Sequence, residues 1–296
     1  MKPQELFQSN HTAMVIETLH YVKKFCGHKM LVKIGGAPLQ NPELVKDLCL
    51  DLSLMRACGI SLVLVHGGGK AINEALEKHN LTWEFHEGQR VTTREMMGII
   101  ESVLSGDVNK RIVRHLNAEN VKAVGLSGAD ARLMECTYLD PRLGEVGQVE
   151  KVNGELLETF LREQERSNQG YIPVVSSVGV LANGQPVNVN ADIACIALAK
   201  ALKIPKIIYM SDEDGILNSE GRIISEIDRS GLNLLIETGV VTGGMLTKVK
   251  TVLSALDDGI EQIHIINGSR SHSLIEEVFT NRGVGTVCQK NWEKLS

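Results

Sequence analysis

Short apolar runs rich in β-branched residues recur along the chain, and longer segments with helical periodicity separate them. In one such segment, Leu44, Leu48, Leu52 and Met55 fall on one face of a helix. Near-continuous apolar strands that alternate with helices are typical of a mainly parallel sheet covered on both faces. The pattern therefore predicts an α/β protein. The predicted strands cover residues 30–34, 61–65, 123–126, 171–175, 206–210 and 262–266.

Two stretches in the middle of the chain, residues 140–147 and 180–188, are rich in turn-forming residues and flank shorter candidate strands. They predict hairpins or lids over a binding site. A soft boundary near Ile204 separates two parts of what we expect to be one continuous domain built on one sheet. The predicted parts are an N-terminal helix and possible oligomerisation arm over 1–28, an N-lobe with the acceptor site over 29–203, and a C-lobe with the nucleotide site over 204–296.

Residues 12–26 carry an apolar stripe at helical spacing, formed by Val15, Leu19, Val22 and Cys26. A stripe of this kind has two interpretations. In one, the helix packs on the core of its own chain, and in the other the stripe is a contact between subunits. The sequence leaves both interpretations open.

Composition narrows the class of protein. Hydrophobic residues make up 43% of the 296 residues and charged residues 23%, as in ordinary globular proteins. A net charge of −5 and an aromatic content of only 4% argue against a nucleic-acid-binding surface. The six cysteines are scattered without a C-x-x-C pair, no apolar stretch is long enough to span a membrane, and the N-terminus has no signal-type block. We therefore expect a cytoplasmic protein without membrane or nucleic-acid partners.

Four segments far apart in the sequence are rich in glycine or asparagine, and three of them also carry lysine or aspartate, which suits them to hold phosphate next to a carboxylate. The first two follow apolar strands and lead into helical segments, where unpaired backbone N–H groups attract anions. Glycine lets a ligand approach the backbone, and lysine supplies a positive charge on a flexible stem. Neither a G-x-x-x-x-G-K-[ST] nor a G-x-G-x-x-G motif is present, so the segments predict a phosphate-handling enzyme outside those two classes. The segments are residues 33–36, 66–69, 188–192 and 243–248.

In this order and spacing, the segments resemble the amino acid kinase family over residues 30–286. Residues 88–92, 125–130 and 264–268 also match. The resemblance is strongest to the acetylglutamate branch, through the Arg-Val-Thr and Asn-x-Asn-Ala-Asp pieces. It implies a three-layer αβα sandwich with a mainly parallel central sheet. It also implies transfer of the γ-phosphoryl group of ATP to the side-chain carboxylate of N-acetyl-L-glutamate, a step of arginine biosynthesis.

The reaction implied by the resemblance needs positive charge more than it needs a base. A carboxylate nucleophile has an ordinary pKa of ~4.3 and is already ionised near neutrality, so the difficulty is to bring two anions together. By similarity, Lys33 and Lys248 flank the transferring phosphoryl group, and Asp192 holds both lysines in place. Asp192 also has a plainer interpretation as the cap of the helix that follows it.

The same resemblance implies a binding site for the phosphoryl acceptor. Arg90 is expected to pair with the substrate α-carboxylate through two parallel hydrogen bonds. Asn188 and Asn190 face one side of an extended segment, where their amides either bind the substrate or simply form a turn. The backbone N–H groups of Gly67 and Gly68 are expected to complete this site.

The nucleotide site is implied mainly by residues 211–215, which resemble the family's adenine and ribose loop. A calcium-binding loop is excluded there, because the glycine stands at the wrong offset and the closing glutamate is absent. Mg²⁺ is expected to arrive with ATP, and no metal ligand of the protein is assigned. The residues expected to bind the nucleotide are Gly35, Gly36, Ser211, Asp212, Gly215, Val240, Thr242 and Gly244.

Lys70 departs from the family pattern, in which a proline usually follows the glycine triplet. The lysine adds a charge beside the acceptor loop, where it either favours a more anionic substrate or points to solvent. Two alternatives to an acetylglutamate-phosphorylating kinase stay open. They are a sibling kinase that acts on another acceptor, such as acetylaminoadipate, and a non-catalytic arginine sensor, although the intact Lys33, Asp192 and Lys248 argue against the sensor.

Arginine-inhibited members of the family carry an extra N-terminal helix that ties dimers into a hexameric ring, and residues 12–26 resemble it. We therefore expect a homo-oligomer that is inhibited by arginine, in which dimers assemble into a hexamer as a trimer of dimers. Glu277 is the natural partner for a guanidinium group. The residues expected at the inhibitor site are Tyr21, His272, Glu277, Gly283 and Gly285.

Overall fold

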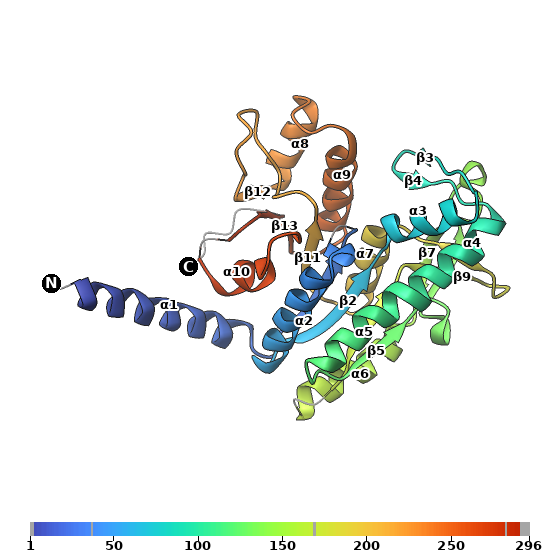
Figure 1. The fold of residues 1–296 in the computed structure, drawn as a ribbon. Helices are drawn as coiled ribbons and strands as arrows, with labels where there is room; N and C mark the ends of the chain where they lie inside the picture. Colours follow the sequence, from blue (N-terminus) through green and yellow to red (C-terminus); the bar gives the residue numbers. More distant parts are fainter. Residues whose placement is uncertain (1–2, 37, 168–169, 282, 291–296) are drawn as a thin grey trace.

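A computed structural model describes residues 3–36, 38–167, 170–281 and 283–290 (Figure 1). The outer ends of the predicted N-terminal arm and C-lobe, residues 1–2 and 291–296, lie outside the described residues. The long first helix leaves the body of the molecule, and the other elements gather around one large twisted sheet (Figure 1).

The central sheet has eight strands, and all neighbouring pairs are parallel except β13 with β14. The three strands β11, β1 and β2 lie in its middle. In order across the sheet the strands are β12 (Glu226–Asp228), β14 (Thr286–Gln289), β13 (Gln262–Asn267), β11 (Lys206–Ser211), β1 (Lys29–Ile34), β2 (Ser61–His66), β8 (Ile172–Ser176) and β5 (Ala123–Leu126).

All the strands predicted from apolar runs are present in this sheet, within one or two residues of their predicted ends. Strands β12 and β14 were not predicted, because they are short and contain polar residues such as Glu226 and Gln289. The sheet continues across Ile204, since β11 pairs with β1 in the register Val32 to Ile208. The expectation of one continuous sheet is therefore confirmed, while the lobe boundary stays a prediction.

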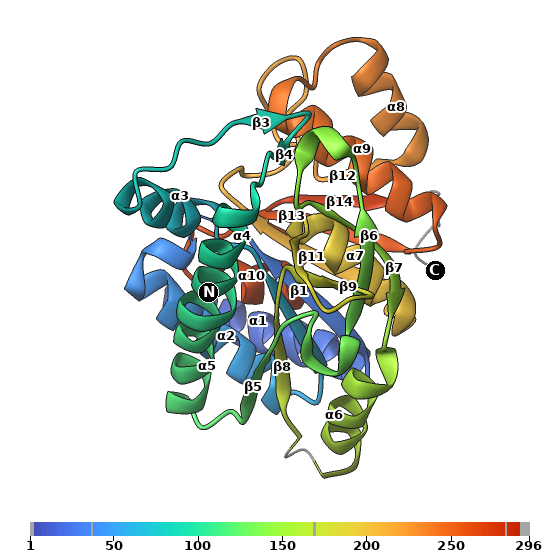
Figure 2. The same ribbon diagram turned by 90° about the vertical axis from the view of Figure 1, so that its right-hand side faces the viewer.

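Neighbouring residues of a strand point to opposite faces of the sheet, so each central strand contributes to two cores. Leu31 belongs to a buried cluster with Leu198 of α7. Val32 belongs to another cluster with Leu52 of α2 and Ile112 of α5. Helices cover both faces of the sheet (Figure 2), which confirms the three-layer arrangement. The helices are α1 (Pro3–Phe25), α2 (Pro42–Ala57), α3 (Gly69–Lys78), α4 (Arg94–Glu101), α5 (Asn109–Ala118), α6 (Gly154–Ser167), α7 (Ala191–Ala201), α8 (Arg229–Glu237), α9 (Gly243–Asp257) and α10 (Ser273–Phe279).

Smaller elements lie around these layers. The stretches 140–147 and 180–188 both form the turns of antiparallel hairpins, as predicted. A π-helix, η2 (Ser102–Val108), joins α4 to α5. The remaining strands are β6 (Met134–Tyr138), β7 (Gly147–Val152), β9 (Val178–Leu181) and β10 (Pro186–Asn188) of a four-stranded sheet, with the hairpin β3 (Phe85–His86) and β4 (Gln89–Arg90), and the 3-10 turns are η1 (Pro38–Gln40), η3 (Asp130–Arg132) and η4 (Pro141–Leu143).

Helix α1 begins earlier than predicted, and residues of its last turns pack on the body. Val22 contacts the core, as the first interpretation of its apolar stripe requires. Val15 and Leu19 are 57% and 59% exposed, and Met14 and Ile16 beside them are 62% and 63% exposed. The outer part of the helix therefore presents an uncovered apolar surface. None of the described helices combines the length and the apolar character that crossing a membrane requires.

Candidate active site

A cavity of about 570 Å³ opens beyond the carboxyl ends of β1 and β11, the place where ligands collect in parallel sheets. All eight residues expected to bind the nucleotide line it, together with Lys33 and Lys248. Glycine is required at Gly35, because a Cβ there would lie 2.9 Å from the Met210 carbonyl oxygen of the neighbouring strand. The first glycine turn therefore lies directly against the end of β11.

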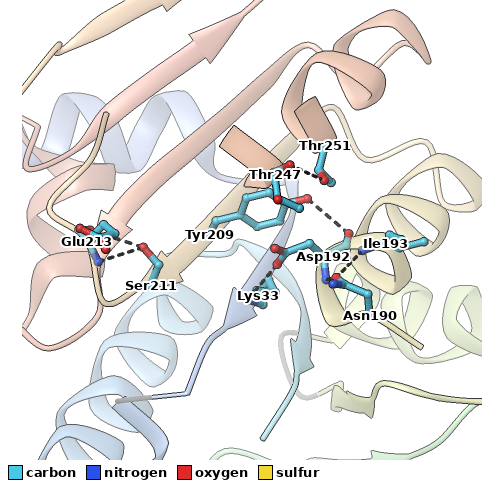
Figure 3. A network of polar contacts seen from close by, with 9 residues as sticks. All are labelled: Lys33, Asn190, Asp192, Ile193, Tyr209, Ser211, Glu213, Thr247 and Thr251. Carbon is cyan, nitrogen blue, oxygen red and sulfur yellow. Dashed lines mark hydrogen bonds and ion pairs between the residues drawn. The ribbon is translucent and has the colours of Figure 1, made fainter. Parts of the chain in front are cut away.

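Lys33 and Asp192 form an ion pair between β1 and the first turn of α7 (Figure 3). Lys33 Nζ lies 2.8 Å from Asp192 Oδ1, and the two side chains are only 13% and 20% exposed. Asn190, and not Asp192, caps α7, because its Oδ1 accepts from the backbone N–H groups of Asp192 and Ile193. The capping interpretation of Asp192 is therefore wrong, and its carboxylate is left to meet Lys33.

Lys248 projects from α9 toward the same charges. Burial lowers the pKa of Lys248, and the positive charge of Lys33 acts in the same direction, whereas Asp192, Glu213 and Asp212 oppose the shift. These groups therefore lie within electrostatic reach of one another around the cavity. The expected catalytic residues Lys33, Asp192 and Lys248 come together from three different elements.

Tyr209 was missed by the sequence analysis, although it lies beneath this group (Figure 3). It is 1% exposed, and its hydroxyl donates to the Asp192 backbone carbonyl oxygen at 3.4 Å. Its strand position pairs with Lys33 across the sheet. A tyrosine inside an otherwise apolar strand was the signal available in the sequence.

Arg90 lies in the β3–β4 hairpin and is 6% exposed. Its Nη2 donates to the side chain of Asn73 and, at 3.4 Å, to the Gly69 carbonyl oxygen. Its guanidinium carbon lies 4.8 Å from the ring centroid of Phe85. Within the described part of the chain its Nη1 is buried without a hydrogen-bond partner. A buried guanidinium with one open nitrogen, beside the second glycine loop, is suited to an anionic ligand.

The other residues expected at the acceptor site lie close to this arginine. Asn188 donates to the Thr92 hydroxyl at 3.1 Å, two residues beyond Arg90. A Cβ on Gly67 would lie 3.2 Å from the Cβ of Ala191, the residue before Asp192. The glycine loop, the Asn188–Asn190 segment and the hairpin therefore surround one end of the sheet. Lys70, which follows the loop, is exposed.

The residues expected at the inhibitor site are only partly brought together. Tyr21 bonds Asn281, and a Cβ on Gly283 would lie 3.3 Å from the carboxylate of Glu277. Gly285 lies against β13, since a Cβ there would lie 2.0 Å from the Ile265 carbonyl oxygen.

His272, another residue expected at the inhibitor site, contacts a different helix. Its Nδ1 lies 2.7 Å from a carboxylate oxygen of Asp51 on α2, so the ring is bonded away from Glu277. The histidine beside Glu277 is His264 of β13, whose Nδ1 lies 2.5 Å from the Glu277 carboxylate. Lys206 also acts on Glu277, and burial lowers the pKa of this lysine to about 8. Sequence analysis missed His264 and Lys206, although polar residues in buried strands were a signal for both.

The acidic residues of the cavity bear on metal binding. Among the described residues, no group of three or more histidine, cysteine, aspartate or glutamate side chains is placed to hold a metal ion. The carboxylates of Asp212 and Glu213 do line the cavity. One or two carboxylates together with substrate phosphates are the usual environment of Mg²⁺. The cavity therefore fits an ion that is carried mainly by a nucleotide.

Comparison with known proteins identifies the family. The model of the amino acid kinase family matches residues 28–267. The acetylglutamate kinase of Aquifex aeolicus is 39% identical over 91% of this chain and 94% of its own length. The acetylglutamate kinase of Clostridioides difficile is 39% identical over 94% and 97%, and that of Citrifermentans bemidjiense is 37% identical over 97% and 99%.

Solved structures agree on the fold. The N-acetylglutamate synthase of Neisseria gonorrhoeae, complexed with coenzyme A and N-acetylglutamate, superposes with a TM-score of 0.85 at 23% identity. The match covers 95% of this chain and 64% of the synthase chain. The protein smu.665 from Streptococcus mutans gives a TM-score of 0.74 at 27% identity, with 89% and 99% covered. The chain belongs to the amino acid kinase family.

Proposed function

We propose that this protein is an ATP-dependent kinase that phosphorylates the side-chain carboxylate of N-acetyl-L-glutamate. The observation that carries the proposal is its similarity over nearly the whole chain to acetylglutamate kinases, at 37–39% identity. The charges around the cavity support it, because two lysines and one aspartate meet where a γ-phosphoryl group would have to lie.

In this reaction the protein must overcome the repulsion between two anions, the acceptor carboxylate and the phosphates of ATP. The acceptor carboxylate is ionised near neutral pH and needs no general base. Lys33, fixed by its ion pair with Asp192, supplies positive charge from the sheet. Lys248 supplies positive charge from the start of α9, and a compact ammonium group can follow the phosphoryl group as it moves. Positioning and charge neutralisation are therefore the main contributions of the chain.

Mg²⁺ bound to the ATP phosphates would add further neutralising charge at this site. Asp212 and Glu213 are the acidic residues that line the cavity near such an ion. The nucleotide itself would occupy the cavity between the Gly35–Gly36 turn and the start of α9. This assigns nucleotide binding to the C-lobe and to the first glycine turn.

The acceptor would lie beside the second glycine loop. The open Nη1 of Arg90 supports a contact with the substrate α-carboxylate. The amide of Asn188 is hydrogen-bonded to Thr92, two residues from Arg90. Asn190 is the N-cap residue of α7. The N-lobe, residues 29–203, would therefore carry the acceptor site and the C-lobe, residues 204–296, the nucleotide site.

The reaction is tested by trapping the acyl phosphate product as its hydroxamate. N-acetylglutamate, acetylaminoadipate, glutamate, aspartate and carbamate are compared as acceptors with ATP in parallel. We expect strong preference for N-acetylglutamate. Preference for another acceptor would assign the chain to a sibling kinase, and the absence of product with all five would favour the arginine sensor.

We also propose that the chain forms oligomers through α1 and that arginine inhibits it. The exposed apolar residues of the outer part of α1 support a contact between subunits. Near the base of the helix, Glu277 lies beside His264 and close to Gly283, while Tyr21 is bonded to Asn281. A carboxylate that faces this junction is a suitable partner for the guanidinium group of arginine.

A further inference from the structure

A buried polar cluster lies behind the second glycine loop, among residues to which no role has been given above. His66 at the end of β2 and Asn109 at the start of α5 are both 0% exposed. Asn109 directly follows the π-helix η2, and a Cβ on Gly68 would lie only 2.7 Å from Leu104 of that helix. π-Helical turns often occur at functional sites. The cluster and the glycine loop therefore form one packed unit.

One fixed acceptor determines the direction of the hydrogen bonds in this cluster. The side-chain nitrogen of Asn109 lies 2.9 Å from the Val174 carbonyl oxygen, which can only accept. The same nitrogen lies 3.1 Å from Nε2 of His66 and 3.4 Å from the Leu126 carbonyl oxygen. Because the amide nitrogen is a donor in all three contacts, its second hydrogen goes to Nε2, the nearer of these two atoms. Asn109 Oδ1 in turn accepts from Lys110. His66 Nε2 is therefore an acceptor.

This arrangement puts the ring hydrogen of His66 on Nδ1. Burial lowers the pKa of His66 to about 4, and the charges of Lys110 and Arg111 act in the same direction. The ring is therefore neutral near pH 7 and carries a single N–H group. Nδ1 lies 3.0 Å from the Gly67 carbonyl oxygen, to which it donates.

We propose that His66 and Asn109 are positioning residues, which fix the Gly67–Gly68 peptide so that the Gly68 N–H points at the reacting groups. The N–H and the carbonyl of a trans peptide point in opposite directions, and the structure contains no cis peptide bond among its described residues. Because His66 holds the Gly67 carbonyl on the buried side, the Gly68 N–H is turned away from the ring. The inference rests on the proposed function, since the N–H would face the acceptor and the transferring phosphoryl group.

Other contacts of the loop agree with this orientation. The Gly67 N–H donates to the Ile34 carbonyl oxygen at 3.4 Å, beside the first glycine turn. The His66 carbonyl oxygen accepts from Ser177 at 3.2 Å. Within the described part of the chain, the Gly68 N–H makes none of the backbone hydrogen bonds found in turns and loops. The loop is thus held on both sides of a donor that is available to a ligand.

Two substitutions of His66 test the roles of its two ring nitrogens one at a time. The amide nitrogen of asparagine can take the place of Nδ1, whereas the longer glutamine side chain reaches only the place of Nε2. His66→Asn should therefore keep the donor to Gly67, and His66→Gln should lose it. Both variants remove the ring, so general damage to the buried site affects them alike, and thermal unfolding of both is measured as the control.

We expect kcat with N-acetylglutamate to be at least about tenfold lower for His66→Gln than for His66→Asn, because loss of a donor to developing negative charge mainly slows the chemical step. KM for ATP should stay within about twofold of wild type in both variants. Equal kcat values, or a faster His66→Gln variant, would overturn the inference.

A second measurement tests the positioning without any activity. Ring-nitrogen NMR of the wild-type protein at pH 7 should show a neutral histidine protonated at Nδ1, and its signal should be missing in His66→Asn. A ring protonated at Nε2 or at both nitrogens would contradict the proposal. If the wild-type protein has no acetylglutamate kinase activity, the proposed function fails, but this NMR result still decides the orientation of His66.

Discussion

From the environment of Lys248 we predict the effect of its removal on kcat and the pH dependence of kcat. Lys248→Ala should lower kcat by about 10²- to 10³-fold, because a charge beside the transferring group is lost. Lys250, which is exposed on the same helix, provides the control, and Lys250→Ala should leave kcat within about twofold of wild type. Steady-state kinetics that show only a few-fold loss in Lys248→Ala would contradict the role given to this lysine.

The pH dependence follows from the direction of the shift. The pKa of Lys248 lies below the free value of 10.5 because of its burial. The ammonium charge is present below this lowered pKa and is lost as the pH rises through it, so kcat should fall at a lower pH than the titration of a free lysine would cause. In Lys248→Arg the fall should move to higher pH, because the guanidinium pKa is above 12. An unchanged alkaline limb would show that another group causes it.

A substitution of Arg90 tests its proposed contact with the substrate carboxylate. Lysine keeps the charge but cannot form two parallel hydrogen bonds, and Phe85 supports a planar group at this position. Arg90→Lys should raise KM for N-acetylglutamate by about tenfold or more, with a smaller effect on kcat. Arg94→Lys, at an exposed position four residues later, is the control. An unchanged KM in Arg90→Lys would exclude the contact with the substrate carboxylate.

At the scale of elements, His272 and Asp51 connect α10 to α2 and should make this contact sensitive to pH. The bond to Asp51 raises the pKa of His272, whereas burial raises the pKa of Asp51. A raised histidine pKa gives stability that is fully present below the unfolded pKa of about 6.5 and is lost as the pH rises through the folded value. Because His272 is half exposed, the effect should be below about 1 kcal/mol.

The matched substitution is His272→Asn. Asparagine tolerates the left-handed backbone at this position, where φ is 58°, and its amide can still donate to Asp51 without carrying a charge. Denaturant unfolding should show wild type to be more stable than His272→Asn at pH 6, with the difference reduced at pH 9. A difference that stays constant or grows with pH would show that the charge of His272 does not contribute.

At the scale of the whole molecule, the outer part of α1 is the proposed contact between subunits. Light scattering of the wild-type protein should give the mass of a hexamer. Val15→Glu combined with Leu19→Glu should give smaller oligomers, because charges would be buried in an apolar interface. Lys23→Glu is an exposed control on the same helix and should leave the mass unchanged. Wild-type dimers with full activity in millimolar arginine would contradict both the ring and the inhibition.

The layers of the fold and the segments that build the site follow from local patterns of amino acids. Apolar runs such as residues 61–65, which are short and β-branched, favour buried strands, because leaving them exposed to water is unfavourable. Glycine turns at the carboxyl ends of such strands mark a place for anions, whatever the rest of the chain does. The six apolar strands of the central sheet, the three layers and the segments around the cavity were therefore predictable, whereas the short polar strands β12 and β14 were not.

Which side chains meet depends on how the elements pack against one another. Asp192 pairs with Lys33 because Asn190 takes over the cap of α7. His272 bonds Asp51, and His264 takes the place beside Glu277. Partners so far apart in sequence are chosen by packing and by the register of strands, and local patterns carry no information about either. For the same reason, the sequence predicted the second glycine loop but not the buried residues that orient it.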